Sequence, residues 1–231
     1  MWLIIGVSGA TCSGKSTLAK SLHNALPGSL LICQDDFFLP LDSELHTFIP
    51  NLKHFNWEIM SSLDMEKMHS TVENILSTNN AKSVLLNDLK DAVGKVLGSS
   101  LTNDETEQGK LDPISQLKSS RPSDQTALSI RILIIEGFLI FNDKKLSEMC
   151  RLKYFMTLSR EQCWARRSVR TYDPPDVPGY FDQCVWPEYE KHRDQVFTQV
   201  PNVTVIDGTL DRNNVLKKVL LDVLQAAQEL R

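Results

Sequence analysis

Apolar residues gather in five short runs along the chain, separated by longer segments in which apolar residues recur every three or four positions. The continuous apolarity of the runs predicts strands covered on both faces of a sheet, over residues 2–7, 29–33, 130–135, 152–158 and 203–206. The periodic segments predict helices over 15–26, about 58–77, 82–97, 160–171, 182–199 and 212–230, the last capped by Asp211. This alternation predicts an α/β fold with a doubly wound, parallel, five-stranded sheet.

One stretch departs from the alternation. Residues 99–127 are mostly Ser, Thr, Asn, Asp, Glu, Gln and Lys, and no aromatic residue occurs from 58 to 137. Such a segment buries too little apolar surface to offset the entropy lost when it is ordered. We therefore expect a single domain over 1–231 that carries a mobile surface insert at 99–127.

The composition limits the classes of function. The 231 residues are 42% apolar and 23% charged, as in ordinary globular proteins, and the formal net charge of −4 disfavours a general nucleic-acid binder. Five cysteines without a C-x-x-C pair indicate reduced thiols, and five histidines without ligand spacing give no reason to expect zinc. No apolar run is long enough for a membrane span, and the first strand lacks the basic flank of a signal peptide. We expect a cytoplasmic protein without a membrane partner.

A glycine-rich loop follows the first predicted strand and opens the first predicted helix. It fits G-x-x-x-x-G-K-[ST] and comprises Gly9, Ala10, Thr11, Cys12, Ser13, Gly14, Lys15 and Ser16, with Thr17 next. Backbone N–H groups in such a loop point at phosphate oxygens, and the N-terminus of the following helix adds to the attraction. The pattern predicts a nucleoside triphosphate site in which Lys15 reaches the β and γ phosphates and Ser16 holds Mg²⁺.

Carboxylates at the ends of two other predicted strands suggest the reaction. Asp35 and Asp36 follow the second strand, where a carboxylate can accept a proton from an attacking hydroxyl, although the pair alone is equally typical of a loop. Glu136 ends the most apolar strand. A buried carboxylate there is costly unless it faces a cation or water, so it indicates a magnesium partner.

Three arginines precede a proline break at 174–175. Arg166 and Arg170 are four residues apart and share a face of the predicted helix, with Arg167 beside them. Charge runs are usually solvated surface. Beside a phosphate-binding loop, however, they predict a lid that brings guanidinium groups to the transferring phosphoryl.

Four segments of the chain together resemble the nicotinamide riboside kinases. They are IIGVSGATCSGKSTLAK at the start, QDDFF at 34–38, ILIIEGFLIF at 132–141 and YDPPDVPGYFDQCVWPEY at 172–189. The resemblance covers residues 1 to about 76 and about 130 to 210. The glycine loop is shared with the wider uridine-kinase-like group, whereas PPDxPGYFD is far more restricted.

The resemblance implies roles for the residues of phosphoryl transfer. The matching positions are Lys15 and Ser16 for phosphate and magnesium, Asp35 for the catalytic base, Glu136 for the magnesium carboxylate, and Arg166 and Arg170 for the phosphate-facing lid. The fold it implies is the P-loop kinase type, with a helical lid and substrate-binding segments.

The resemblance also implies an acceptor site. Arg167 matches a residue that helps to hold the ribose hydroxyls, and Tyr172 matches an aromatic that stacks on the pyridine ring. Trp57 and Glu58 stand where family members typically carry Tyr or Trp followed by Asp, the carboxylate that holds the ribose diol. Glu58 is one methylene longer but keeps the charge. A pyridinium ring between two aromatic faces agrees with stacking and cation–π attraction.

The resemblance implies a kinase that uses Mg²⁺ and moves the γ-phosphoryl of ATP to the 5′-hydroxyl of nicotinamide riboside, and also of nicotinic acid riboside, on a route to NAD. One alternative is a uridine or cytidine kinase. Another is a nucleotide-dependent switch, or an inactive relative that acts as an interaction protein. Neither a D-x-x-G after a strand nor an N-K-x-D occurs, and every expected catalytic position holds a competent residue. We expect a monomer with small-molecule substrates.

Overall fold

The computed structural model describes residues 1–78, 82–98 and 129–230, and its main sheet has the strand order β2-β6-β1-β7-β8. All neighbouring pairs in this order are parallel. The strands are β1 (Trp2–Gly9), β2 (Leu30–Cys33), β6 (Ser129–Glu136), β7 (Leu152–Thr157) and β8 (Val203–Asp207). The predicted doubly wound α/β sheet is confirmed. A short strand that was not predicted, β5 (Val84–Leu85), pairs antiparallel with the beginning of β6.

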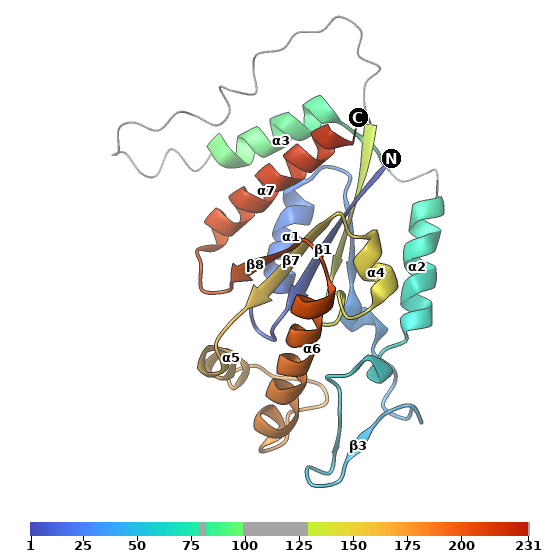
Figure 1. The fold of residues 1–231 in the computed structure, drawn as a ribbon, viewed down its shortest axis with the longest axis vertical. Helices are drawn as coiled ribbons and strands as arrows, with labels where there is room; N and C mark the ends of the chain where they lie inside the picture. The colour runs from blue at the N-terminus through green and yellow to red at the C-terminus, as the bar shows by residue number, and fades with distance from the viewer. Residues whose placement is uncertain (79–81, 99–128, 231) are drawn as a thin grey trace, which may run out of the picture.

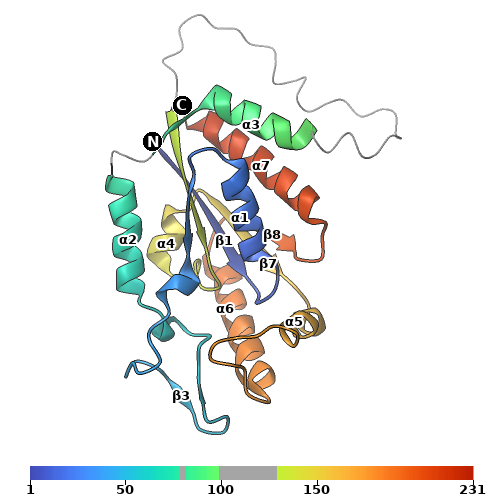
Figure 2. The same ribbon diagram turned by 180° about the vertical axis from the view of Figure 1, so that it is seen from behind.

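Helices cover both faces of the sheet (Figures 1 and 2). They are α1 (Lys15–Ala25), α2 (Met65–Ser77), α3 (Leu86–Gly98), α4 (Lys144–Met149), α5 (Arg160–Arg167), α6 (Trp186–Gln199) and α7 (Arg212–Glu229). Leu3, Ile5 and Val7 of β1 pack with α1, α3 and α7, whereas Ile4 packs with α2, α4 and α6 on the other face. Both faces of the strand are therefore buried, which explains its continuous apolarity.

Four predicted helices have the wrong limits, and the one expected over 82–97 begins only at Leu86 because β5 precedes it. The helix expected from about 58 begins at Met65, because the Asp64 carboxylate accepts a hydrogen bond from the Lys67 N–H and caps the helix there. A short 3₁₀ turn, η2 (Met60–Ser62), precedes it. The helix expected to reach 171 ends at Arg167. The segment predicted to begin a helix at 182 opens with a π-helical turn, η4 (Phe181–Val185), which leads into α6.

The carboxyl ends of the central strands meet at one edge of the sheet, where the candidate active site lies. Glu136 at the end of β6 lies opposite Val7 of β1 and Cys33 of β2. The 3₁₀ turn η1 (Gln34–Phe37) follows β2 at this edge. A small hairpin that was not predicted, β3 (Phe48–Ile49) with β4 (His54–Phe55), lies beyond it. A third apolar cluster joins this region to η4 through Leu52, Tyr180 and Phe181.

The insert predicted at 99–127 lies outside the described residues, so the single-domain organisation stays a prediction. The five cysteines form no disulfide with one another in the structure. Within the described part of the chain, no helix has the length and apolarity needed to cross a lipid bilayer.

Candidate active site

A pocket of about 1090 Å³ opens at the carboxyl edge of the sheet. This volume exceeds the range of about 300 to 1,000 Å³ that is usual for one small ligand, so it has room for a donor and an acceptor side by side. Its walls come from the glycine loop, η1, the end of β6, the segment around Trp57, the region from α5 to Asp176, and residues 208–215. Of the predicted site residues, Gly9 and Ala10 lie behind this wall and the others line it.

The glycine loop needs glycine where its backbone turns. Gly9 has a φ of +126°, and a Cβ there would lie 2.0 Å from the Met156 carbonyl oxygen of β7. Gly14, with a φ of +99°, stands directly before α1 and lets the helix begin at Lys15. The Lys15 Nζ donates to the Ala10 carbonyl at 2.6 Å. Burial lowers the pKa of this ammonium group, and the nearby carboxylates of Glu136 and Asp35 oppose that shift.

We expect Gly9→Ala to reduce the free energy of unfolding by about 1 to 3 kcal/mol, because the added methyl meets backbone and the residue keeps a positive φ. Gly94→Ala is the matched control. It lies inside α3, where an added Cβ meets no described atom within 4 Å, so it should stabilise by about 0.5 to 1 kcal/mol. Denaturant unfolding of both variants measures the difference. A neutral Gly9→Ala would show that the loop does not require glycine there.

Carboxylates gather beside Lys15 at the sheet edge. Glu136 is 3% exposed, and burial raises the pKa of its carboxyl group although Lys15 and a hydrogen bond to Ser16 act in the opposite direction. Both Asp35 and Asp36 are exposed, but Asp35 lines the same part of the pocket and Asp36 does not. Gln34 fixes this turn, because its buried side chain accepts a hydrogen bond from the Leu139 N–H at 2.9 Å.

The oxygen atoms of Ser16 and Glu136 fit Mg²⁺. Among the described residues, no group of three or more His, Cys, Asp or Glu side chains could hold a metal ion. Mg²⁺ needs no such cage, since in phosphoryl-transfer sites it usually keeps several waters and takes one or two protein oxygens beside the substrate phosphates. The hydroxyl and the carboxylate already share a hydrogen bond, and a hydrated ion bound to phosphates can use both.

Arg166 and Arg170 both reach the glycine loop. The Arg166 guanidinium donates to the carbonyls of Cys12 and Gly208, each at 3.1 Å, and Arg170 Nη1 lies 3.6 Å from the Cys12 sulfur. The predicted shared helical face is wrong, because α5 ends at Arg167 and Arg170 comes from the loop beyond it. Arg166 therefore joins the loop to the segment after β8, and its contact with a transferring phosphoryl stays a prediction.

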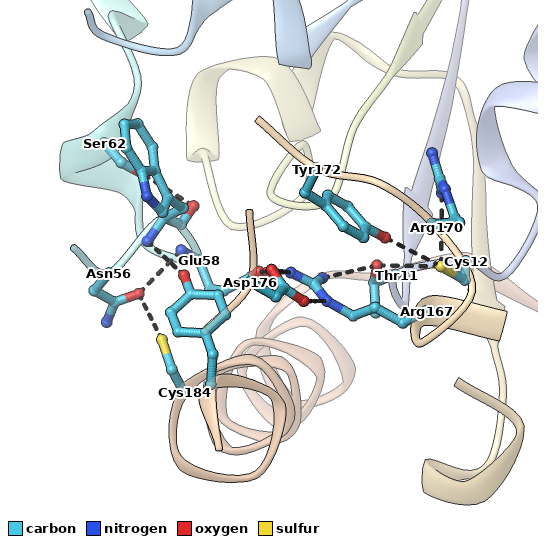
Figure 3. Close-up of polar contacts among 12 residues, drawn as sticks. Thr11, Cys12, Asn56, Glu58, Ser62, Arg167, Arg170, Tyr172, Asp176 and Cys184 are labelled. Carbon is cyan, nitrogen blue, oxygen red and sulfur yellow. Dashed lines mark hydrogen bonds and ion pairs between the residues drawn. The ribbon is translucent and has the colours of Figure 1, made fainter. Parts of the chain in front are cut away.

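Arg167 is the most constrained cation of the site (Figure 3). It is 5% exposed, and Asp176 accepts two hydrogen bonds from it, at 2.6 Å from Nε and 2.9 Å from Nη2. Glu58 Oε1 lies 3.2 Å from Nη2, and Nη1 donates to Thr11 Oγ1 at 3.1 Å. Burial opposes its charge, but the two carboxylates raise the pKa of the guanidinium. Arg167 thus connects the phosphate-binding loop to the predicted acceptor site.

The Glu58 carboxylate is held by its ion pair with this arginine. Burial raises the pKa of its carboxyl group, Asp176 adds to the shift, and Arg167 opposes it. Asp176 was not predicted as a site residue. The restricted PPDxPGYFD segment was the available signal, because Asp176 is its first aspartate.

The two predicted stacking aromatics line the same pocket. The Trp57 ring packs against Phe38, with centroids 5.8 Å apart, and against His46 at 4.4 Å. The guanidinium carbons of Arg167 and Arg170 lie 4.3 and 5.3 Å from the centroid of the Tyr172 ring. The Tyr172 hydroxyl is 3.3 Å from the Cys12 sulfur. The geometry brings both aromatics to one site, while stacking on a pyridine ring stays a prediction.

Residues 208–215 form a wall of the pocket that sequence reasoning missed. The segment begins directly after β8 and runs into the first turn of α7. Its link to the site is the pair of hydrogen bonds from Arg166 to the Gly208 carbonyl, at 3.1 and 3.2 Å. No motif marks it, since the contact uses a backbone oxygen.

Comparison with known proteins shows similarity to kinases, in agreement with a pocket that contains a phosphate-binding loop. The model of the phosphoribulokinase/uridine kinase family matches residues 4–174. The chain is 35% identical over 226 residues to nicotinamide riboside kinase 1 of Mus musculus, covering 98% of this chain and 96% of the mouse protein. It is 34% identical over 223 residues to nicotinamide riboside kinase 2 of Homo sapiens, covering 96% and 81%.

A more distant relative aligns over a similar span. Nicotinamide riboside kinase of Saccharomyces cerevisiae is 27% identical over 222 residues, covering 90% of this chain and 83% of the yeast protein. The similarity therefore extends beyond the glycine loop to nearly the whole chain. The chain belongs to the phosphoribulokinase/uridine kinase family and, within it, to the nicotinamide riboside kinases.

Proposed function

We propose that this protein transfers the γ-phosphoryl group of ATP to the 5′-hydroxyl of nicotinamide riboside and forms the mononucleotide. The observation that supports this most is the Arg167 side chain, which hydrogen-bonds Thr11 of the glycine loop and is paired with Glu58 and Asp176. A phosphate-binding loop and a set of groups suited to a ribose diol thus share one pocket. Nicotinic acid riboside, which has the same ribose, is a second expected substrate, and the product is a precursor of NAD.

The chain's own residues perform the transfer in this proposal. The loop N–H groups and Lys15 bind the phosphates of ATP, and Asp35 orients the 5′-hydroxyl and accepts its proton. Arg166 and Arg170 neutralise charge that develops on the phosphoryl oxygens. Mg²⁺, held through Ser16 and Glu136, supplies further charge neutralisation at the β and γ phosphates when it is bound.

The acceptor is recognised by charge and shape. The Glu58 carboxylate can accept hydrogen bonds from the ribose hydroxyls, and the Arg167 guanidinium can donate to them. Trp57 and Tyr172 offer aromatic faces to a ring that carries a positive charge. The carboxylates of Glu58, Asp176 and Asp35 line the same pocket and attract a cation, although the pocket is also lined by Lys15, Arg166, Arg167 and Arg170.

ADP release measured with a panel of nucleosides tests the proposal. With ATP and magnesium, we expect kcat/KM for nicotinamide riboside to exceed that for uridine and cytidine by at least about 10²-fold, because neutral pyrimidines forgo the cation–π and ionic attraction. Removal of magnesium with EDTA should abolish turnover of every substrate. If uridine or cytidine were the better substrate, the acceptor assignment would be wrong while the kinase assignment would stand.

A further inference from the structure

The backbone of Trp57 and Glu58 is held by side chains. The Trp57 N–H donates to the Tyr180 hydroxyl at 2.9 Å, and the Trp57 carbonyl accepts from Ser62 Oγ at 3.1 Å. The Glu58 N–H donates to Asn56 Oδ1 at 3.0 Å, and the Glu58 carbonyl accepts from His192 Nε2 at 3.0 Å. Ser62 Oγ has one hydrogen to donate and lies closer to the Ile59 carbonyl, at 2.6 Å, so it is shared between two carbonyls. The other three main-chain polar groups of this dipeptide each have a side-chain partner of their own.

The partners are themselves fixed (Figure 3). Ser62 is fully buried, Tyr180 is 1% exposed and Asn56 is 8% exposed. The Asn56 amide donates to Glu188 Oε1 at 3.1 Å, and its Oδ1 accepts a second hydrogen bond from the Cys184 thiol at 3.1 Å. The Trp57 indole N–H and His192 Nδ1 have no hydrogen-bond partner among the described residues, so the main-chain hydrogen bonds are what hold this segment. Breaking one of them leaves a buried donor or acceptor without a partner. The network thus determines where the Trp57 ring and the Glu58 carboxylate lie.

Tyr180 contacts two parts of the predicted acceptor site, the Trp57 backbone and the Arg167 guanidinium. It directly precedes the π-helical turn η4, an irregularity of the kind found frequently at functional sites. Its hydroxyl binds the Trp57 backbone, and its ring centroid lies 5.9 Å from the guanidinium carbon of Arg167. One buried side chain therefore contacts the segment that bears Trp57 and Glu58 and also faces the arginine that pairs with Glu58.

We propose that Tyr180 is a positioning residue for the acceptor nucleoside, acting through the Trp57 backbone and the Arg167 guanidinium. The proposal rests on the proposed function, since it assigns Trp57, Glu58 and Arg167 to acceptor binding. A tyrosine that serves only the core would affect stability and leave substrate affinity unchanged. A positioning residue affects mainly the KM for the acceptor. The glycine loop is linked to Arg167 by one hydrogen bond, from Nη1 to Thr11, and has its own backbone anchors at Met156 of β7 and Leu18 of α1, so the KM for ATP should change much less.

The test compares two Tyr→Phe variants that each remove one buried, hydrogen-bonded hydroxyl. Tyr180→Phe leaves the Trp57 N–H unpaired. Tyr154→Phe is the matched control, because Tyr154 is also 1% exposed, donates to Asp222 at 3.0 Å and does not line the pocket. Steady-state kinetics, with nicotinamide riboside and ATP varied in turn, and thermal melting are measured for both variants beside the wild type.

We expect Tyr180→Phe to raise the KM for nicotinamide riboside about tenfold, equivalent to about 1.4 kcal/mol, and to change the KM for ATP less than twofold. Its preference for the riboside over the 2′-deoxy analogue should also fall. Tyr154→Phe should lower the melting temperature by a similar amount and leave both KM values unchanged. A Tyr180→Phe enzyme with lowered stability but an unchanged riboside KM would overturn the proposal, as would equal increases in both KM values.

His192 provides an independent variant in case Tyr180→Phe does not fold. His192→Ala removes the donor to the Glu58 carbonyl and should raise the riboside KM, whereas His192→Gln retains an N–H donor and should restore most of the affinity. If neither His192 variant changed the riboside KM, the positioning network would be disproved. Wild-type enzyme that did not phosphorylate the riboside would instead refute the proposed function, so the two failures are distinguishable.

Discussion

Replacing Asp35 with asparagine is expected to lower kcat by about 10² to 10⁴, the range typical of a lost general base, while ATP binding stays nearly intact. Asp35 lines the pocket beside Lys15 and Glu136, at the turn that Gln34 fixes against Leu139. Asparagine keeps the shape of the side chain but cannot accept the proton of the 5′-hydroxyl. Steady-state kinetics with nicotinamide riboside, together with the affinity for a non-hydrolysable ATP analogue, would measure both effects.

The adjacent aspartate is the internal control. Both aspartates are exposed, but only Asp35 lines the pocket, so Asp36→Asn should change kcat by no more than a small factor. The two variants remove the same charge one residue apart in the same turn. Equal losses, or a larger loss at Asp36, would show that the wrong carboxylate was assigned.

The parts of the fold and the site that could be predicted are those set by local sequence. The central strands are apolar because both their faces are covered, and this run of apolar residues is visible without any knowledge of the partners. The glycine loop could be located because its motif lies within eight consecutive residues, Gly9 to Ser16. Gly9 and Gly14 occupy backbone conformations that glycine adopts readily, so the motif and the geometry correspond directly.

The parts that could not be predicted depend on contacts between distant segments. Asp176 is a site residue because it accepts a hydrogen bond from Arg167, which α5 places beside it. Tyr180 belongs to the site because its hydroxyl accepts a hydrogen bond from the Trp57 N–H, in the segment after β4. Helix limits failed for a related reason. Arg170 reaches Cys12 from a loop, although its spacing from Arg166 was compatible with one continuous helix. The periodicity of apolar residues does not indicate which polar side chain will form a hydrogen bond or an ion pair with a distant segment of the chain.

Glu58 illustrates how a departure from the family pattern is accommodated. The family typically carries aspartate at this position, and Glu58 still places Oε1 3.2 Å from Arg167 Nη2. Asp176 binds the same guanidinium through Nε and Nη2, so a single cation is shared by two carboxylates. The two carboxylates outnumber the one guanidinium that they share, and in the proposed function this excess of negative charge attracts the pyridinium ring of the nucleoside.

The 2′-deoxy analogue of nicotinamide riboside is expected to lose about 2 to 4 kcal/mol in kcat/KM relative to the riboside. Buried partners built for a hydroxyl are left unpaired when the hydroxyl is absent, and this penalty exceeds the loss of the hydrogen bond itself. The Arg167 side chain is 5% exposed and the Glu58 side chain 16% exposed, and the ion pair between them holds both at the pocket wall, so neither turns freely to bulk water to recover a partner. Competition between the two nucleosides, measured at the same ATP concentration, gives the ratio directly.

Substitution at Glu58 separates its contribution from that of Arg167. Glu58→Gln keeps the length of the side chain but replaces one acceptor oxygen with a donor, so discrimination against the 2′-deoxy analogue should shrink while the KM for ATP stays unchanged. Glu73→Gln is the control, because Glu73 is an exposed carboxylate of α2 paired with Lys145, and its loss should leave the discrimination intact. If the wild-type enzyme phosphorylated the deoxy and ribo substrates equally well, the assignment of Glu58 to the acceptor site would be wrong. A carboxylate that binds the ribose diol loses a hydrogen bond when one of the two hydroxyls is absent, and this loss must lower kcat/KM.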